Sequence, residues 1–382
     1  MGTKESRGNE NTMKVLYLGH YRENTGWANG AIHHMLALKS VGVDVVARNI
    51  ALTPTISDVP DDIKKMESKS LQDIDYCIQH ILPFHVVGTS KFKKNVLFMP
   101  FESTIKSNNS FLLYAKELDE LWVPNNYNQD MLRNANVESK VIPYAFDLPE
   151  YKKDHKALDF KSSNNKFKFY FIGGTDHRKN IRGILKSYLS EFTIADPVTF
   201  MLKLTDPHRD AVEMKNEFIQ KIDALKDNLR MHSQREHYPE INIITEQLPS
   251  ELIQSLHKTC DCYVGPSHGE GWSISAFEAM CYGNTPICSK EGGPVDFIDK
   301  DNKNTGFLVS GSYGVCDHAN PAFDHIFTGN DLWFLPDELE IKRAMRCYYE
   351  NRDSIDRNDG IKAAKQYDYE TVGNRIKEAL NA

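Results

Sequence analysis

The sequence lacks the features that mark membrane, secreted and nucleic-acid-binding proteins. No apolar run approaches the roughly 18 residues of a membrane span, and no secretory apolar core opens the chain. The 46 basic residues are outnumbered by 53 acidic ones, and the net charge of -7 argues against general binding of nucleic acid. This pattern indicates a globular cytoplasmic protein without a transmembrane segment, and it leaves peripheral contact with a membrane open.

Paired cysteines of a zinc site are also missing, because the seven cysteines are scattered along the chain. Cys262, Cys281 and Cys288 fall inside apolar runs, which is typical of reduced core residues in a cytoplasmic protein. The hydrophobic content of 40% supports packed cores, and 382 residues suit two domains better than one.

A dinucleotide fingerprint is absent after the first predicted strand, residues 14–18. The glycines there stand at positions 19, 26 and 30, so the G-x-G-x-x-G spacing is not formed. The loop is either an ordinary strand-to-helix connection or a turn in which Gly26 and Trp27 face a cleft between domains.

One D-x-D sequence, Asp73 to Asp75, has the spelling found in metal-dependent transferases. It precedes the strand predicted at residues 76–81, whereas ligands gather at the carboxyl ends of parallel strands. We therefore predict a solvated turn and no metal site. His80 and His85 stand near the other end of that strand, where either a cleft role or simple packing would suit them.

Apolar runs and helical segments alternate along most of the chain. Strands are predicted at residues 14–18, 43–47, 76–81, 96–99, 120–124 and 140–143, and again at 167–172, 198–204, 241–245, 261–264 and 285–288. This order predicts an α/β protein of two doubly wound, Rossmann-like domains, residues 13–146 and 167–368, that face each other across a cleft. Residues 147–166 lose periodicity and form the predicted linker, and residues 300–335 are expected to be irregular.

The first twelve residues are polar and are predicted to be a disordered tail. Met1, Gly2 and Ser6 match an N-myristoylation pattern. We favour the alternative, an untidy start upstream of Met13, because the pattern is short and promiscuous.

The most informative stretch is residues 265–283, GPSHGEGWSISAFEAMCYG. It leads from a strand into a helix that is apolar on nearly every side, and such a helix is buried. Glu278 lies inside this helix, where a carboxylate is costly unless something pairs with it. Its partner is either a buried arginine, which would make it structural, or the hydroxyl groups of a ligand.

The loop before this helix favours a ligand. Gly269 and Gly271 flank Glu270 and allow backbone to approach closely. The first amides of the helix would be free to bind an anion, and they belong to Trp272, Ser273 and Ile274. A carboxylate for hydroxyl groups beside an anion site suggests a sugar-phosphate ligand.

This stretch resembles the E-x7-E signature of glycosyltransferase family 4, whose members are retaining enzymes of the two-domain GT-B fold. The sequence E-G-W-S-I-S-A-F-E-A-M-C-Y-G-N-T-P-I matches the family pattern at both glutamates, Ala279, Met280, Gly283 and Pro286. It departs from the pattern at Ser273 and Ser275, which replace the usual Gly and Pro. The resemblance covers nearly all of residues 13–382, and it implies that the helix at 369–380 crosses back onto the first domain.

A second candidate stretch, G-G-T-D-H-R-K-N, follows the predicted strand at 167–172. Glycines and a basic pair at a strand-to-helix turn suit a diphosphate, and here they are Gly173, Gly174, Arg178 and Lys179. Lys179 matches a family lysine, but Gly174 stands where the family has an Arg. Either Arg178 supplies the missing charge or the site relies more on backbone amides; the alternative to both is a basic pair on the surface.

Two further residues are candidates by position. Lys203 alternates with apolar neighbours in the strand at 198–204, so it faces either the cleft or the solvent. Glu102 follows the strand at 96–99, at a place near the donor sugar where family members commonly carry a His. We assign both to substrate binding.

The resemblance implies transfer of a sugar from a nucleoside-diphosphate sugar to an acceptor hydroxyl, with retention of configuration and without a metal. Lys179, Arg178 and Glu270 are the predicted catalytic residues, the basic pair acting on the leaving diphosphate. Glu278 would hold the ribose hydroxyls. No cofactor is expected besides the donor, and the acceptor would be a glycan, a lipid-linked sugar or a small molecule. The alternatives are an epimerase or phosphorylase of the same fold, or a catalytically silent sugar-binding protein.

Overall fold

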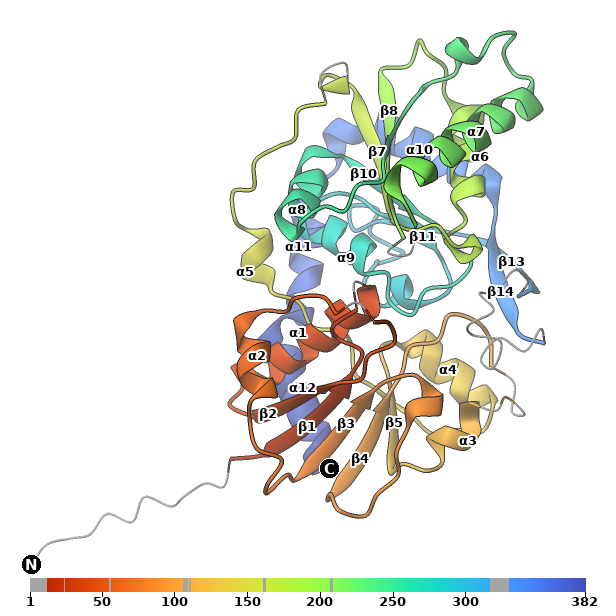
Figure 1. The fold of residues 1–382 in the computed structure, drawn as a ribbon. Coiled ribbons are helices and arrows are strands. Elements are labelled where there is room, and N and C mark those ends of the chain that lie inside the picture. Colours follow the sequence, from red (N-terminus) through yellow and green to blue (C-terminus); the bar gives the residue numbers. More distant parts are fainter. Residues whose placement is uncertain are drawn as a thin grey trace, which may run out of the picture.

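The computed structural model describes residues 12–382 except 24, 55, 106–108, 110, 161–162, 207–208 and 317–329. The chain forms two α/β units, each built on a six-stranded sheet, which lie one above the other in Figure 1. The predicted fold class is thereby confirmed. The predicted tail, apart from Thr12, and the myristoylation pattern lie outside the described residues.

The first sheet has the strand order β2-β1-β3-β4-β5-β6, and its pairs are parallel. Its strands are β1 (Lys14–Gly19), β2 (Asp44–Asn49), β3 (Tyr76–His80), β4 (Lys94–Phe98), β5 (Glu120–Val123) and β6 (Lys140–Val141). The helices between them are α1 (Gly26–Ser40), α2 (Asp61–Glu67), α3 (Phe111–Ala115) and α4 (Asn126–Asn134). Parallel strands need such crossovers, and helices on both faces explain why the strand centres are continuously apolar.

The second sheet has the order β12-β11-β10-β7-β8-β9, again with parallel pairs. Its strands are β7 (Phe167–Gly174), β8 (Val198–Thr205), β9 (Glu240–Ile244), β10 (Cys262–Gly265), β11 (Ile287–Ser289) and β12 (Phe307–Val309). The helices are α6 (Ile181–Glu191), α7 (Ala211–Leu229), α8 (Ser250–Thr259), α9 (Ile274–Cys281), α10 (Glu338–Glu350) and α11 (Arg357–Ala364). A short helix, α5 (Leu148–Tyr151), lies in the segment between the two sheets.

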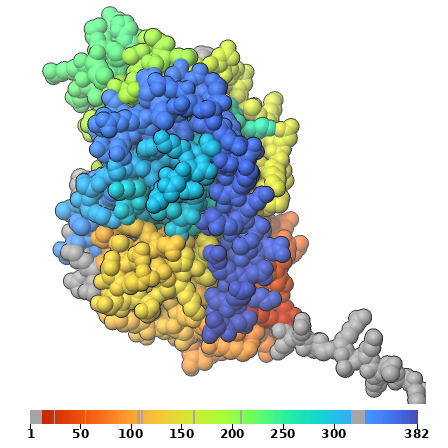
Figure 2. All heavy atoms as spheres, turned by 180° about the vertical axis from the view of Figure 1, so that it is seen from behind, coloured from red at the N-terminus to blue at the C-terminus, as the bar shows by residue number. Residues whose placement is uncertain are grey.

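The last helix, α12 (Tyr369–Asn381), packs on the first unit although it follows the second in sequence. A Cβ on Gly373 would lie 2.3 Å from the carbonyl oxygen of Ala37, so α12 and α1 meet at the backbone. Tyr369 and His33 join the same two helices, with 2.7 Å between the hydroxyl and Nδ1. Figure 2 shows this blue C-terminal segment running beside the orange and yellow residues of the first unit.

An aromatic cluster joins the two units. The rings of Phe146, which ends the first unit, and Phe277 of α9 stack with their centroids 4.0 Å apart. Trp272, only 2% exposed, contacts both of these rings and that of Tyr367. The cluster holds the start of α9 against the first unit, so the candidate stretch lies where the units meet.

The described part of residues 300–335, which leaves out 317–329, contains strands where an irregular segment was predicted, and this correction has a physical reason. β12 extends the second sheet, and β13 (Gly311–Val315) pairs in antiparallel fashion with β14 (Leu332–Pro336). The partners in that ladder lie up to 25 positions apart, from Gly311 to Pro336. A composition rich in Asn, Gly and Asp reports local turn preference and carries no signal for pairing over such a distance.

Candidate functional site

Two loops from different units meet at the end of β10. A Cβ on Gly269 would lie 1.7 Å from the carbonyl oxygen of Glu102, and one on Gly271 would lie 2.4 Å from the Cβ of Pro100. Both glycines are therefore needed for close approach of the segment after β10 to the segment after β4. Asn125 of the first unit also donates a side-chain hydrogen bond to the carbonyl of Gly271.

The backbone is strained where this loop enters α9. Ser273 has φ of 71°, in the left-handed region that non-glycine residues rarely adopt. Such strain costs of order 1–3 kcal/mol and concentrates at functional sites. The amides of Trp272, Ser273 and Ile274 donate no hydrogen bond within the described residues. They are the orphan donors that a helix N-terminus offers to an anion.

Charged side chains gather beside this helix end. Lys179 Nζ lies 2.7 Å from Oε1 of Glu270, and Arg178 Nη1 lies 3.6 Å from Oε2 of the same carboxylate. Arg178 Nε also lies 3.0 Å from Oε2 of Glu102, so its guanidinium joins carboxylates of both units. Two of the predicted cations and two of the predicted acids are thus brought into one cluster. Asp176, 3.6 Å from Arg178, belongs to it as well and was not predicted.

The pKa values of the two glutamates in this cluster shift in opposite directions. Burial opposes ionisation of Glu270, whose side chain is 12% exposed, but the charges of Lys179 and Arg178 outweigh it and hold its pKa below the usual range. Glu102 differs, because loss of solvent raises its pKa and Arg178 offsets this only in part. Glu270 is therefore held as an anion between two cations.

The Arg178 side chain reaches from the turn after β7 to the loop before α9. Gly173 and Gly174 end β7, and Arg178 follows in the 3-10 turn His177–Lys179. Its Nη1 donates to the carbonyl of Gly269 at 2.6 Å, which aims the guanidinium into the loop before α9. A surface basic pair is therefore the wrong interpretation of Arg178 and Lys179, whose side chains are 16% and 19% exposed.

Glu278 lies on α9 with a side chain 15% exposed. Its Oε1 accepts a hydrogen bond from the Tyr151 hydroxyl at 3.4 Å, and its Oε2 lies 3.4 Å from Nε2 of His257. Within the described part of the chain no arginine pairs with it, so the structural alternative of a buried Arg–Glu pair is wrong. Both contacts are long for hydrogen bonds, and a carboxylate with about four acceptor positions keeps room for more donors.

The remaining predicted residues have different surroundings. A Cβ on Gly26 would lie 3.6 Å from Ile274 Cδ1, so the start of α1 faces the start of α9. Trp27, half-buried, donates from Nε1 to the carbonyl of His80 at 3.1 Å. His80 is fully buried and hydrogen-bonds Tyr17, so it packs in the first unit.

Lys203 does not face the solvent, and that alternative is wrong. The residue is 1% exposed, and its Nζ donates to the carbonyl of Leu204 at 2.8 Å and to the hydroxyl of Thr205 at 3.0 Å. Burial lowers its pKa. The Lys203 ammonium thus binds acceptors at the end of its own strand, β8. Within the described residues it makes no hydrogen bond to the charged cluster.

Tyr151 and His257, which lie beside Glu278, were not predicted as site residues. Tyr151 lies in the predicted linker. The charged residues and the absence of hydrophobic periodicity there gave no indication that this tyrosine is buried. His257 is a polar residue on the buried side of the amphipathic helix α8, and that was the available signal.

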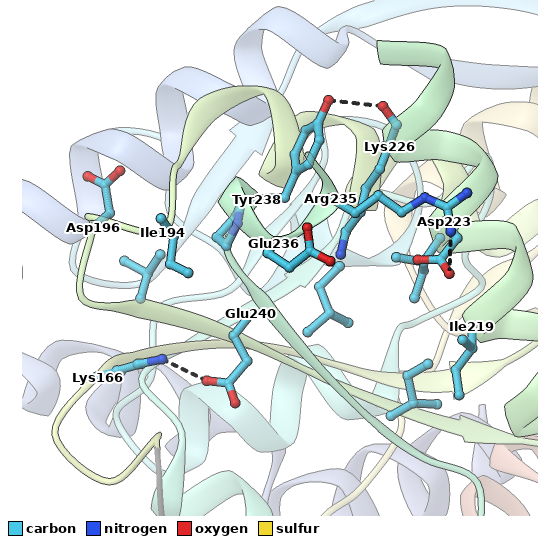
Figure 3. Close-up of a pocket in the computed structure, with 15 residues that line it drawn as sticks. Lys166, Ile194, Asp196, Ile219, Asp223, Lys226, Arg235, Glu236, Tyr238 and Glu240 are labelled. Atoms are coloured by element: carbon cyan, nitrogen blue, oxygen red, sulfur yellow. Dashed lines mark hydrogen bonds and ion pairs between the residues drawn. The ribbon is translucent and has the colours of Figure 1, made fainter. Parts of the chain in front are cut away.

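The surface also has an open hollow of about 450 Å³ at the edge of the second sheet (Figure 3). It lies between α7, β9 and the segment before β9, and its rim carries Lys166, Lys226, Arg235 and Glu240. None of the predicted site residues lines it. Two of its basic side chains are already paired, Lys166 with Glu240 at 2.8 Å and Arg235 with Asp223 at 3.0 Å, so we place the candidate site at the junction of the two units instead.

Comparison with known proteins gives similarities of two kinds. The family model of the glycosyl transferases group 1 matches residues 223–313, a segment that includes Glu270 and Glu278. Sucrose synthase 5 of Arabidopsis thaliana is 26% identical over 179 residues, 44% of this chain. The chain spans about a fifth of that curated relative, 20% of its length.

Solved structures resemble nearly the whole chain. HepE of Anabaena in complex with UDP-glucose has a TM-score of 0.64 at 13% identity and covers 97% of this chain and 99% of its own. The sucrose-phosphate synthase of Thermosynechococcus elongatus has a TM-score of 0.64 at 14% identity, covering 97% and 98%. An E. coli trehalose-6-phosphate protein bound with UDP-2-fluoro glucose has a TM-score of 0.64 at 10% identity, covering 96% and 99%. The chain therefore has the two-domain GT-B fold of these proteins.

Proposed function

We propose that the protein is a glycosyltransferase that moves a sugar from a nucleoside-diphosphate sugar to an acceptor hydroxyl. One observation carries the proposal: two cations, two acids and the free amides at the start of α9 meet where the two units touch. A diphosphate needs the cations and amides, and a sugar needs the carboxylates. We choose a uridine nucleotide as the first donor to test, because similar structures hold UDP or UDP-glucose.

The residues have distinct roles in this proposal. As the bond between the anomeric carbon and the diphosphate oxygen breaks, Lys179, Arg178 and the amides before α9 stabilise the negative charge that develops on the leaving group. Such preorganised donors usually supply the largest single share of catalysis. Glu270 contacts the sugar ring, and Glu278 accepts hydrogen bonds from the two ribose hydroxyls.

Retention of configuration would follow if the acceptor attacks on the face that the diphosphate leaves. The acceptor oxygen then bonds to the anomeric carbon while its proton passes to the departing phosphate oxygen. No separate base is required for this step, and no metal is required to balance it. Within the described residues, no group of three or more His, Cys, Asp or Glu side chains is arranged to hold a metal ion.

The ion pair between Lys179 and Glu270 has a further consequence for donor binding. We infer that a diphosphate competes with Oε1 of Glu270 for the Lys179 ammonium, which now lies 2.7 Å from that oxygen, and draws it away. This would release the carboxylate to accept sugar hydroxyls. Donor binding thus exchanges an internal ion pair for two charged contacts with the ligand.

Product analysis tests the proposal. The protein is incubated with UDP-glucose and other UDP-sugars, with and without a panel of saccharide acceptors, and the products are separated by chromatography. A transferase releases UDP and yields a new glycoside only when an acceptor is present. An epimerase changes the sugar without releasing UDP, a phosphorylase requires inorganic phosphate, and a silent binding protein leaves every donor intact. Any of these three results with a bound donor would overturn the proposal.

A further inference from the structure

A histidine stands directly behind Glu278 and takes no part in the proposed chemistry so far. His257 lies on α8 and is 0% exposed. The ring of Tyr282 stacks on its imidazole, with the two planes 1° apart and the centroids separated by 5.8 Å. The plane of the imidazole is therefore fixed, and only the position of its proton is left to decide.

Neighbouring groups decide which ring nitrogen of His257 carries that proton. The side-chain amide nitrogen of Asn284 donates to the backbone carbonyl of His257 at 2.6 Å and to the hydroxyl oxygen of Tyr170 at 3.0 Å. Its amide oxygen faces Nη1 of Arg357 at 3.5 Å, which agrees with this orientation. The Tyr170 hydroxyl thus accepts from Asn284 and has its single hydrogen left to donate.

Nδ1 of His257 lies 2.8 Å from the Tyr170 oxygen and is the acceptor available to that hydrogen. Nδ1 is then an acceptor, and in a neutral imidazole the proton must sit on the other nitrogen, Nε2. Nε2 is buried and makes no aligned hydrogen bond within the described residues. Its nearest charged neighbour is Oε2 of Glu278, at 3.4 Å.

We propose that His257 is a positioning residue for Glu278: its Nε2–H, fixed in that tautomer by Tyr170, holds one carboxylate oxygen so that the remaining acceptor positions face the ribose hydroxyls. The inference rests on the proposed function, because it assigns a task to Glu278. Tyr151, which donates to Oε1, holds the other side of the same carboxylate.

The geometry distinguishes this role from simple packing. A histidine that served only to fill the core would have each buried nitrogen paired within the protein, since an unpaired buried N–H is costly. His257 has one nitrogen paired and turns the other toward Glu278 at slightly more than hydrogen-bond length. When hydroxyl donors draw the carboxylate into place, this contact can shorten to an aligned bond.

A matched pair of variants isolates the hydrogen bond. Gln and Met have nearly the same length and volume, but only Gln can place an N–H where Nε2 lies. We expect His257→Gln to bind UDP within about threefold of the wild type. His257→Met should bind about tenfold more weakly, the value of one hydrogen bond to a charged group. Isothermal titration with UDP measures both, and melting temperatures confirm that both are folded.

The same pair in a Glu278→Gln background completes the test. There His257→Met and His257→Gln should have equal affinities for UDP, because the carboxylate that His257 positions is gone. Equal weakening by both substitutions in the native background, or an undiminished difference in the Glu278→Gln background, would overturn the inference while leaving the proposed function intact. A wild type that binds neither UDP, GDP nor ADP would overturn the proposed function, and the inference with it.

A second measurement reads the tautomer in the wild-type protein and does not depend on a binding constant. Long-range nitrogen–proton correlation spectra of the wild-type imidazoles report the tautomer of each histidine, and the His257→Gln spectrum identifies the signals of His257. We expect the Nε2–H form in the free protein. An Nδ1–H form would contradict the proposal whatever the titrations give.

Discussion

Lys179→Ala should separate the catalytic role proposed for this lysine from its structural role. In the native protein Lys179 Nζ lies 2.7 Å from Glu270, and removing it leaves that carboxylate with Arg178 at 3.6 Å and with the Ser267 hydroxyl at 3.0 Å. A buried charge that loses its only partner costs about 3–5 kcal/mol. Because Glu270 keeps two partners, we expect a loss of about 1–2 kcal/mol in the free energy of unfolding. The activation barrier should rise by about 3 kcal/mol, because one charged donor to the leaving diphosphate is lost. Turnover should therefore fall roughly a hundredfold or more.

The stability loss should also depend on pH with a definite sign. The pKa of Glu270 is lowered in the folded protein, against burial, by Lys179 and then by Arg178. A carboxylate with a depressed pKa contributes stability above its unfolded pKa of about 4.3 and loses it as the pH falls through the folded value. The gap in stability between the wild type and Lys179→Ala should therefore be full at pH 7 and shrink as the pH falls below about 4.3.

Urea unfolding at several pH values measures this gap, and steady-state UDP release measures turnover. Lys166→Ala is a matched control, because it removes a lysine paired with Glu240 at 2.8 Å on the rim of the hollow in Figure 3. The control should retain wild-type turnover. Near wild-type turnover in Lys179→Ala, or an equal loss in the control, would refute the assignment of Lys179 to the diphosphate.

Three further outcomes follow from the same structure. Gly269→Ala places a Cβ where the Glu102 carbonyl now lies 1.7 Å away, so the loops must separate; we expect transfer to fall at least tenfold, and an unchanged rate would show that the close contact is dispensable. Trp272→Ala empties the centre of the aromatic cluster and should cost about 3–5 kcal/mol in urea unfolding, whereas a cost below about 1 kcal/mol would mean that the units pack independently. Activity should persist in excess EDTA, because in the proposed mechanism Lys179, Arg178 and the amides before α9 stabilise the charge of the leaving diphosphate; loss in EDTA with recovery in magnesium or manganese would contradict that mechanism.

The alternation of strands and helices was predictable because it depends on local periodicity. The bounds of β7 and β8 were predicted to within about two residues. A short run of apolar and aromatic residues such as Phe167 to Ile172 is typical of a buried strand and is too short for most helices. The role of the glycines around Glu270 was also predictable, because two backbone segments can approach closely only where no Cβ stands between them. Gly269 and Gly271 are the positions where a Cβ would meet the other unit.

What could not be predicted depends on contacts between distant parts of the chain. The pairing of Arg178 with Glu102 joins two units, and neither residue's neighbours in sequence signal the other. Lys203 shows a separate limit, that of the alternation of polar and apolar residues in a strand. The same pattern fits a lysine that faces the solvent and a buried lysine whose ammonium binds its own strand. β13 and β14 were missed because their ladder pairs residues up to 25 positions apart in the sequence, from Gly311 to Pro336.

Titration of UDP into the wild type and into Glu278→Gln tests the central claim most directly. Glu278 has two long contacts, to Tyr151 and His257, and within the described residues no ion pair with arginine or lysine. The amide of Gln can keep one of these contacts, so the melting temperature should change little. Affinity for UDP should fall by about 1.5–3 kcal/mol, the value of hydrogen bonds to a charged group. An unchanged dissociation constant beside a collapsed melting temperature would make Glu278 a structural residue and contradict the site.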